Sequence, residues 1–281
     1  MIRAARLALL AALALAPAFA SGCCGPQKGP AQAPPPEVAA IAASERARVG
    51  SLAALQGRGV VELRTKDHEG EHFDQGDLDF RWMPGRGFAA SVSKLGDRWA
   101  WIGSDGVRWW AFELKAQPVA LRTGQLAGTR AGTSAALPWL LAIVPLAPAP
   151  GATVRMHDGV ASVPVDAGAA PLPPATVIEA DFDPRSLAPV AVRIVRGGEV
   201  VCASTLRDFM PVETAGASPG AWPRIPRRVR ASASGQAGTS EIAVTFDTAR
   251  ADREAVDKPG LYDFQALRDR FAPGKTEDDP Q

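Results

Sequence analysis

Two histidines and four acidic residues lie between Asp67 and Asp74. Imidazole nitrogens and carboxylate oxygens are the usual protein ligands of zinc and other divalent metals. On a helix His68 and His72 would share a face, but Glu69-Gly70 marks a turn between two strands, so their spacing does not bring them together. Charged residues in such a turn are normally solvated. The segment therefore predicts an exposed hairpin tip and no metal site.

A serine in Gly216-Ala217-Ser218-Pro219-Gly220 matches the letters of the hydrolase nucleophile elbow. That motif requires a helix after the serine, which Pro219 and the following Trp222-Pro223 exclude. The chain has three histidines, and it shows no acid–base constellation, phosphate-binding loop or dinucleotide fingerprint. The sequence predicts neither an enzyme nor a bound cofactor.

Tryptophan is concentrated between residues 82 and 110, with five rings at Trp82, Trp99, Trp101, Trp109 and Trp110. Because strand side chains alternate, we expect Trp99 and Trp101 to share one sheet face, and Trp109 and Trp110 to point to opposite faces. Such rings form ordinary core in most proteins, but they would also suit an open apolar groove for a hydrocarbon chain, and both roles can coexist. The predicted groove residues are Phe80, Trp82, Trp99, Trp101 and Trp109.

The chain begins with a basic and apolar leader typical of a secretory signal. Its apolar run, residues 7–20, is shorter than the roughly 20 residues that a helix needs to span a bilayer. The leader ends in Ala20-Ser21-Gly22-Cys23, and small residues before a cysteine resemble the lipobox of bacterial lipoproteins. That resemblance implies removal of residues 1–22 and attachment of a diacylglyceryl group to Cys23. Cleavage after Ala20, releasing a soluble protein, is the alternative.

Removing the leader takes away two arginines and changes the formal charge from +1 to −1. Nothing in that balance suggests nucleic-acid binding, which requires a concentrated basic surface. Residues 23–36 are rich in proline and glycine and predict an extended tether after the lipidated cysteine. Besides Cys23, the chain has Cys24 and Cys202, too few for a disulfide framework, and Cys202 is expected to be a buried structural thiol.

Periodicity predicts an α+β architecture. Apolar residues recur at spacings of three and four residues over residues 37–55, which indicates an N-terminal helix. From residue 61 to residue 247 the period is two, with Asp-Gly turns between runs, which predicts about eleven antiparallel strands. A second, short helix is expected near residues 137–144, before an irregular connection. Residues 274–281 are expected to form a disordered acidic tail.

This order resembles the half-barrel superfamily of lipoprotein carriers and acceptors, namely LolA, LolB and related outer-membrane lipoprotein-sorting proteins. The likeness lies in residues 51–63 (SLAALQGRGVVEL), 82–110 (WMPGRGFAASVSKLGDRWAWIGSDGVRWW), 137–148 (LPWLLAIVPLAP) and 181–194 (DFDPRSLAPVAVRI). It implies an open antiparallel half-barrel over residues 37–273, with the N-terminal helix and one internal helix on its concave face. The long connection at 145–174 departs from the compact carriers.

The resemblance implies a monomeric, membrane-anchored periplasmic lipoprotein that binds acyl chains, with acyl chains or lipoproteins as cargo in sorting or lipid transport. The alternative is a structural or regulatory envelope lipoprotein with the same fold and no transport role. Cys24 is not the aspartate that retains lipoproteins at the inner membrane in the resembled systems, which favours the outer membrane. A basic patch, comprising Arg224, Arg227, Arg228 and Arg230, suits either anionic headgroups or the outer face of an edge strand.

Overall fold

The structure is a computed structural model that describes residues 34–67, 70–125, 137–166, 175–235, 238–258 and 260–278. The helices are α1 (Val38–Val49), α2 (Leu137–Leu140), α3 (Arg253–Val256) and α4 (Phe264–Phe271), with a 3₁₀ turn η1 (Pro219–Ala221). The strands are β1 (Leu55–Asp67), β2 (Gly70–Met83), β3 (Gly87–Lys94), β4 (Asp97–Ser104), β5 (Arg108–Glu113), β6 (Ala120–Gln125), β7 (Arg155–His157), β8 (Val160–Val165), β9 (Thr176–Phe182), β10 (Pro189–Arg196), β11 (Glu199–Pro211), β12 (Arg224–Gly235), β13 (Gly238–Arg250) and β14 (Lys275–Asp278). The predicted leader, Cys23, Cys24, most of the tether, His68 and Glu69 lie outside the described residues.

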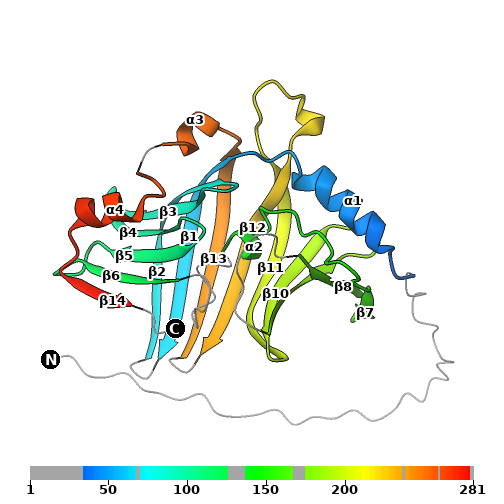
Figure 1. The fold of residues 1–281 in the computed structure, drawn as a ribbon, viewed down its shortest axis with the longest axis horizontal. Coiled ribbons are helices and arrows are strands. Elements are labelled where there is room, and N and C mark those ends of the chain that lie inside the picture. The colour runs from blue at the N-terminus through cyan, green and yellow to red at the C-terminus, as the bar shows by residue number, and fades with distance from the viewer. Residues whose placement is uncertain are drawn as a thin grey trace, which may run out of the picture. The chain divides into compact units, whose positions relative to one another are not determined.

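All described strands belong to one 14-stranded sheet, in the order β14-β6-β5-β4-β3-β2-β1-β13-β12-β11-β10-β9-β8-β7 (Figure 1). The chain runs from β1 to β6, which lies next to the edge strand β14, crosses to β7 at the opposite edge, and returns to β13 beside β1. Neighbours pair antiparallel except β14 and β6. The two edges do not join, so the predicted α+β open half-barrel is confirmed, with more strands than the expected eleven.

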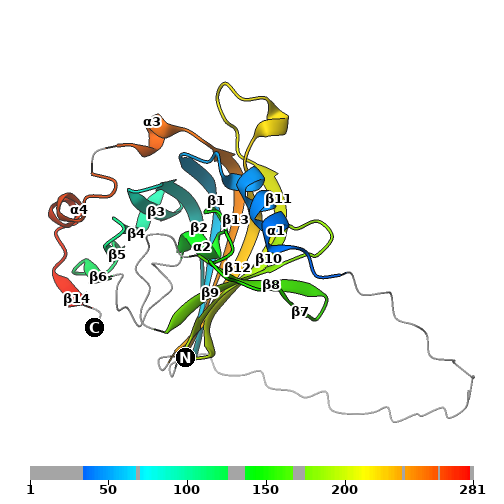
Figure 2. The ribbon, with the colours of Figure 1, turned by 45° about the vertical axis from the view of Figure 1, so that its right-hand side comes forward.

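The two faces of the sheet are covered by different elements. We call the face that carries the larger apolar cluster, with α1 and α2, the inner face; the outer face of β3–β6 is covered by α4. Figure 2 shows α2 and α4 on opposite sides of these strands. Strand β2 illustrates how the sequence separates the faces, because its buried Leu78, Phe80 and Trp82 alternate with more exposed charged residues.

Both predicted helices exist but are shorter than expected. Helix α1 buries one stripe, Ile41, Glu45 and Val49, and ends before Gly50. Helix α2 is a single turn, and Ala142, with φ +49°, leaves the helical conformation two residues after it. The following segment nevertheless contributes Leu141, Ile143 and other fully covered side chains to the core. Among the described residues no helix is long and apolar enough to cross a membrane.

Two expectations about the surface are wrong. Residues 275–278 do not belong to a disordered tail, because they form β14 and pair in parallel with β6, supported by an Arg122–Glu277 ion pair of 3.4 Å. Residues 279–281 lie outside the described part. The basic patch is not on an edge strand either, since β12 lies between β11 and β13. There, Arg228 and Arg230 pair with Asp208 and Glu241.

Candidate functional site: the aromatic inner face

Aromatic rings of β2 and β3 form the centre of the inner face. Trp82 lies opposite Phe88 in the register of these strands, and Phe80 lies opposite Ala90. Phe80 stacks on Phe88 with a centroid distance of 6.2 Å and meets Phe246 of β13 edge-on at 6.3 Å. Phe80 is fully buried and Trp82 is 7% exposed. These two predicted groove residues are therefore covered in this structure.

Strand β4 does not keep the alternation that the sequence suggests. Val92 pairs with Ala100 but Ser93 pairs with Arg98, so Trp99 is an extra residue in a β-bulge. Trp99 consequently packs, partly exposed, against the inner-face cluster, whereas Trp101 belongs to the outer-face cluster. The prediction that Trp99 and Trp101 share a face is wrong. Strand β3 lies between β4 and β2, so Trp99 and Trp101 are not on a strand adjacent to that of Phe80 and Trp82.

The prediction for β5 is confirmed. Trp110 is fully buried in the outer-face cluster, 5.7 Å from the ring of Phe264. Trp109 pairs with Ser104, which itself pairs with Phe88, so Trp109 lies on the inner face. The indole N–H groups of Trp101, Trp109 and Trp110 are buried and have no hydrogen-bond partner among the described residues. Of these three donors, only that of Trp109 points to the inner face.

A buried ion pair holds α1 over the inner face. Glu45 is completely buried and accepts two hydrogen bonds from Arg48, at 2.7 and 2.6 Å, and one from the backbone N–H of Leu146 at 3.0 Å. Arg48 also donates to the carbonyl oxygens of Ala142 and Arg224, at 2.8 and 3.1 Å. We call this network the α1 clamp. It joins α1 to the connection after α2 and to the start of β12.

The α1 clamp was not predicted, although the sequence contains a signal for it. Ile41, Glu45 and Val49 are four residues apart, so a carboxylate occupies the middle of the apolar stripe of a helix. A buried carboxylate requires a partner. Arg48, on the next turn, supplies that partner.

The other residues considered for chemistry include Ser218, His157 and Cys202, which lie in the described part of the chain. No group of three or more possible ligands for a metal ion is found there. Ser218 is exposed and precedes the one-turn η1. His157 lies 3.5 Å from Asp181, which is held at 2.7 Å by Arg193 in an outer-face ion-pair network. Cys202 is buried as predicted, and burial raises the pKa of its thiol to about 11.

Comparisons with known proteins concern the fold. No family model matches the chain, and no curated protein matches it either. Among solved structures, the similar ones include proteins described as belonging to the superfamily that the sequence resembles.

Three of these structures can be compared directly. A LolA superfamily protein from Nitrosomonas europaea has a TM-score of 0.47 and 10% identity, covering 79% of this chain and 97% of that protein. A domain described as an outer membrane lipoprotein-sorting protein, from Vibrio parahaemolyticus, has a TM-score of 0.45 and 12% identity, with coverages of 80% and 97%. A DUF1329 family protein from Desulfovibrio piger has a TM-score of 0.49 and 9% identity, with coverages of 82% and 98%.

Proposed function

We propose that the protein is a membrane-anchored periplasmic lipoprotein that binds acyl chains on the inner face of its half-barrel, in lipoprotein sorting or lipid transport. The supporting observation is the aromatic inner face of β2–β5. Trp99 is partly exposed there, and the buried indole N–H of Trp109 has no acceptor among the residues that the structure describes. An ester or carboxyl oxygen of a lipid would satisfy that donor, which is costly to leave unpaired.

The burial of the other rings sets a condition on binding. Phe80, Trp82 and Trp109 are at most 7% exposed. An acyl chain therefore enters beside Trp99 and displaces part of the inner-face covering, which includes α1 and residues 141–146. A sixteen-carbon chain gains on the order of 12 kcal/mol of transfer free energy at ~0.8 kcal/mol per CH₂. Chain ordering and displacement of the covering consume much of that gain, which leaves binding in the micromolar range.

The bulge of β4 provides a matched test. Trp99→Ala removes a ring from the inner face, and Trp101→Ala removes the same ring from the outer face of the same strand. Losing about 60 Å² of ring contact, at ~25 cal/mol per Å², weakens binding about tenfold. We expect uptake of a fluorescent fatty acid by the purified protein to fall by that factor in Trp99→Ala. Trp101→Ala should bind like the unmodified protein under conditions where urea unfolding shows it to be folded.

The alternative, a structural or regulatory envelope lipoprotein, is favoured by the complete burial of Phe80. On that alternative no hydrocarbon is taken up, and Trp99→Ala and Trp101→Ala both only lower the free energy of unfolding, by up to the ~3–5 kcal/mol typical of core aromatic residues. Equal loss of fatty-acid uptake in the two variants would also contradict an inner-face site.

Anchoring is tested separately at the cysteines near the leader. We expect Cys23→Ser to abolish lipid labelling and to release the protein into the soluble fraction, because one thioether-linked diacylglyceryl group supplies the two chains that stable anchoring requires. Cys24→Ser is the control and should stay membrane-bound. Release of Cys24→Ser but not of Cys23→Ser would show that the lipidation site is misassigned. Fractionation of the two membranes tests the preference for the outer one.

A further inference from the structure

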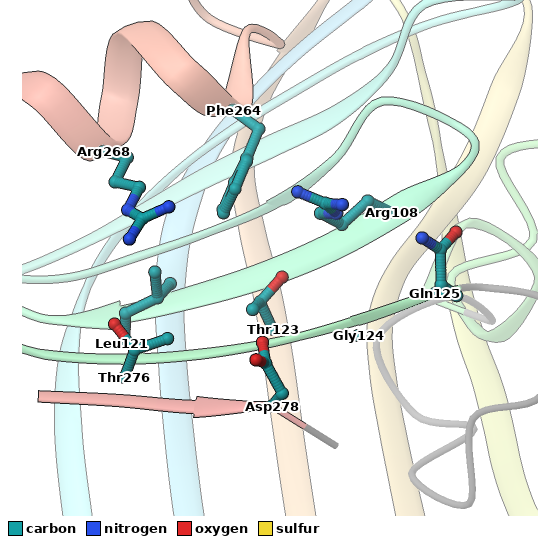
Figure 3. A pocket seen from close by; sticks show the side chains of 9 residues that line it. All are labelled: Arg108, Leu121, Thr123, Gly124, Gln125, Phe264, Arg268, Thr276 and Asp278. Atoms are coloured by element: carbon teal, nitrogen blue, oxygen red, sulfur yellow. The ribbon is translucent and has the colours of Figure 1, made fainter. Parts of the chain in front are cut away.

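A pocket of about 420 Å³ lies on the outer face, between α4 and strands β5, β6 and β14 near one edge of the sheet (Figure 3). It is separate from the aromatic inner face, because the sheet itself lies between them. The floor includes Leu121 and Thr123 of β6, and Phe264 of α4 forms one wall. Arginines from two elements complete it, Arg108 from β5 and Arg268 from α4.

Within the described residues, the charged side chains that line this pocket have no ion-pair partner. Figure 3 shows the guanidinium groups of Arg108 and Arg268 pointing into the same space, with the carboxylate of Asp278 directed toward it from β14. None of these three side chains takes part in an ion pair within the described residues. The neighbouring Arg122, which does not line the pocket, is paired with Glu277 at 3.4 Å. Arg108 and Arg268 thus differ from Arg122 in having no ion-pair partner among the described residues.

The surrounding contacts hold the pocket in shape without a ligand. The guanidinium carbon of Arg108 lies 4.7 Å from the ring centre of Phe264, which orients that side chain. Helix α4 is fixed by buried Leu267 and by the Asp263 carboxylate, which accepts from the Ala266 N–H at 2.9 Å. The Thr123 hydroxyl donates to the carbonyl oxygen of Trp109 at 2.8 Å. A donor that is already oriented, as Arg108 is, loses less entropy on binding.

We propose that this pocket binds a phosphoethanolamine group. Guanidinium groups offer paired N–H donors that match the oxygens of a phosphate, and Arg108 and Arg268 present two of them together. The carboxylate of Asp278 faces the ammonium group of the ligand. Phe264 and Leu121 contact the ligand's carbon atoms, next to its phosphate and ammonium groups. The volume and charge suit such a headgroup, whereas an acyl chain would leave both arginines desolvated and unpaired. The group comes either from a soluble phosphate ester or from the headgroup of a phospholipid.

The test is calorimetric titration of the purified protein with phosphoethanolamine and, separately, with glycerol phosphate, which lacks the ammonium group. We expect Arg108→Gln and Arg268→Gln to weaken phosphoethanolamine binding about tenfold or more, since each removes charge-assisted hydrogen bonds. Asp278→Asn should weaken phosphoethanolamine and leave glycerol phosphate unchanged. Arg270→Gln is the matched control, because Arg270 lies on the same helix but contacts Phe271 and does not line the pocket.

The outcomes distinguish the possibilities. Absence of binding at millimolar phosphoethanolamine overturns the proposal, as does an equal loss in Arg268→Gln and Arg270→Gln, which would indicate unspecific attraction to a basic surface. Equal affinity for the two ligands overturns the role of Asp278. Co-sedimentation with phosphatidylethanolamine vesicles, lost in Arg268→Gln, identifies a lipid headgroup; binding of the free ester alone identifies a soluble ligand. Trp99→Ala should change none of these results. The proposal for the pocket can therefore be refuted without refuting the proposal for the inner face, and the reverse.

Discussion

Removing the charge of Glu45 should destabilise the protein more than any comparable change on its surface. The carboxylate is completely buried, and the Arg48 side chain is only 8% exposed. Glu45→Gln keeps the volume but leaves the guanidinium of Arg48 without a counter-charge. Breaking a buried ion pair from one side typically costs ~3–5 kcal/mol, because a buried charge remains unpaired. That is a large part of the ~5–15 kcal/mol by which a domain is usually stable.

The assay is urea unfolding followed by tryptophan fluorescence, with Glu213→Gln as the matched control. Glu213 lies 3.0 Å from Arg250, and both side chains are more than half exposed. The same substitution there should cost less than about 1 kcal/mol, as is usual for solvent-exposed ion pairs. The double variant Glu45→Leu/Arg48→Met should recover part of the loss, since replacing both partners leaves no buried charge.

Two results would refute this reasoning. If Glu45→Gln and Glu213→Gln cost the same, burial does not strengthen the α1 clamp. If the loss of stability in Glu45→Leu/Arg48→Met equals the sum of the losses in Glu45→Leu and Arg48→Met, the two side chains are not coupled. Since the clamp joins α1 to the segment after α2, Glu45→Gln should also increase amide hydrogen exchange in α1 before the strands exchange.

Three further predictions concern packing, titration and helix capping. Gly103→Ala would place a Cβ 2.8 Å from the indole nitrogen of Trp110 and 2.9 Å from a backbone oxygen. We expect it to lower the free energy of unfolding, measured in urea, by about 1–3 kcal/mol. Gly220→Ala is the control and should be nearly neutral, because a Cβ there meets nothing within 4 Å. Burial raises the pKa of Cys202 from 9.0 to about 11. The buried neutral thiol therefore contributes fully to the free energy of unfolding below pH 9, and this contribution, up to about 3 kcal/mol, should be lost as the pH rises toward 11. Cys202→Ala should flatten that decline of stability with pH, and an unchanged pH profile would contradict the prediction. Asp263→Ala removes the N-cap of α4. It should lower the free energy of unfolding by about 1 kcal/mol and raise amide hydrogen exchange in that helix. Unchanged stability and exchange would contradict this prediction.

The local elements could be predicted from the sequence because their signals are local. The stripe at Ile41 and Val49 indicates α1, and Asp105-Gly106 indicates the β4–β5 hairpin, in which the Asp105 side chain accepts from the backbone N–H groups of Val107 and Arg108. Strand β14 could not be predicted in this way. Its residues Lys275–Asp278 are all exposed and mostly charged, and the backbone of β6, far away in the chain, provides its pairing.

The face of each tryptophan depends on register, which the sequence pattern does not contain. Alternation alone puts Trp99 and Trp101 together, but the bulge opposite Val92 and Ser93 shifts the strand by one residue at that point. Helix α4 was not predicted, although its sequence contains a local signal. Asp263 precedes an apolar spacing of Phe264, Leu267 and Phe271, which is typical of a capped amphipathic helix.

The bulge also explains how one short sheet region can serve two different faces. Beyond it, β4 and β5 direct Trp101 and Trp110 outward, where α4 covers them and completes the arginine pocket. Trp109, beside Trp110 in the chain, points inward, and the bulge adds Trp99 to that side. The outer rings are thus needed to seat α4, and their loss should affect the pocket before it affects the inner face. The proposed acyl-chain site and the proposed phosphoethanolamine site therefore share strands but no side chains, and adjacent residues can be substituted to change one without the other.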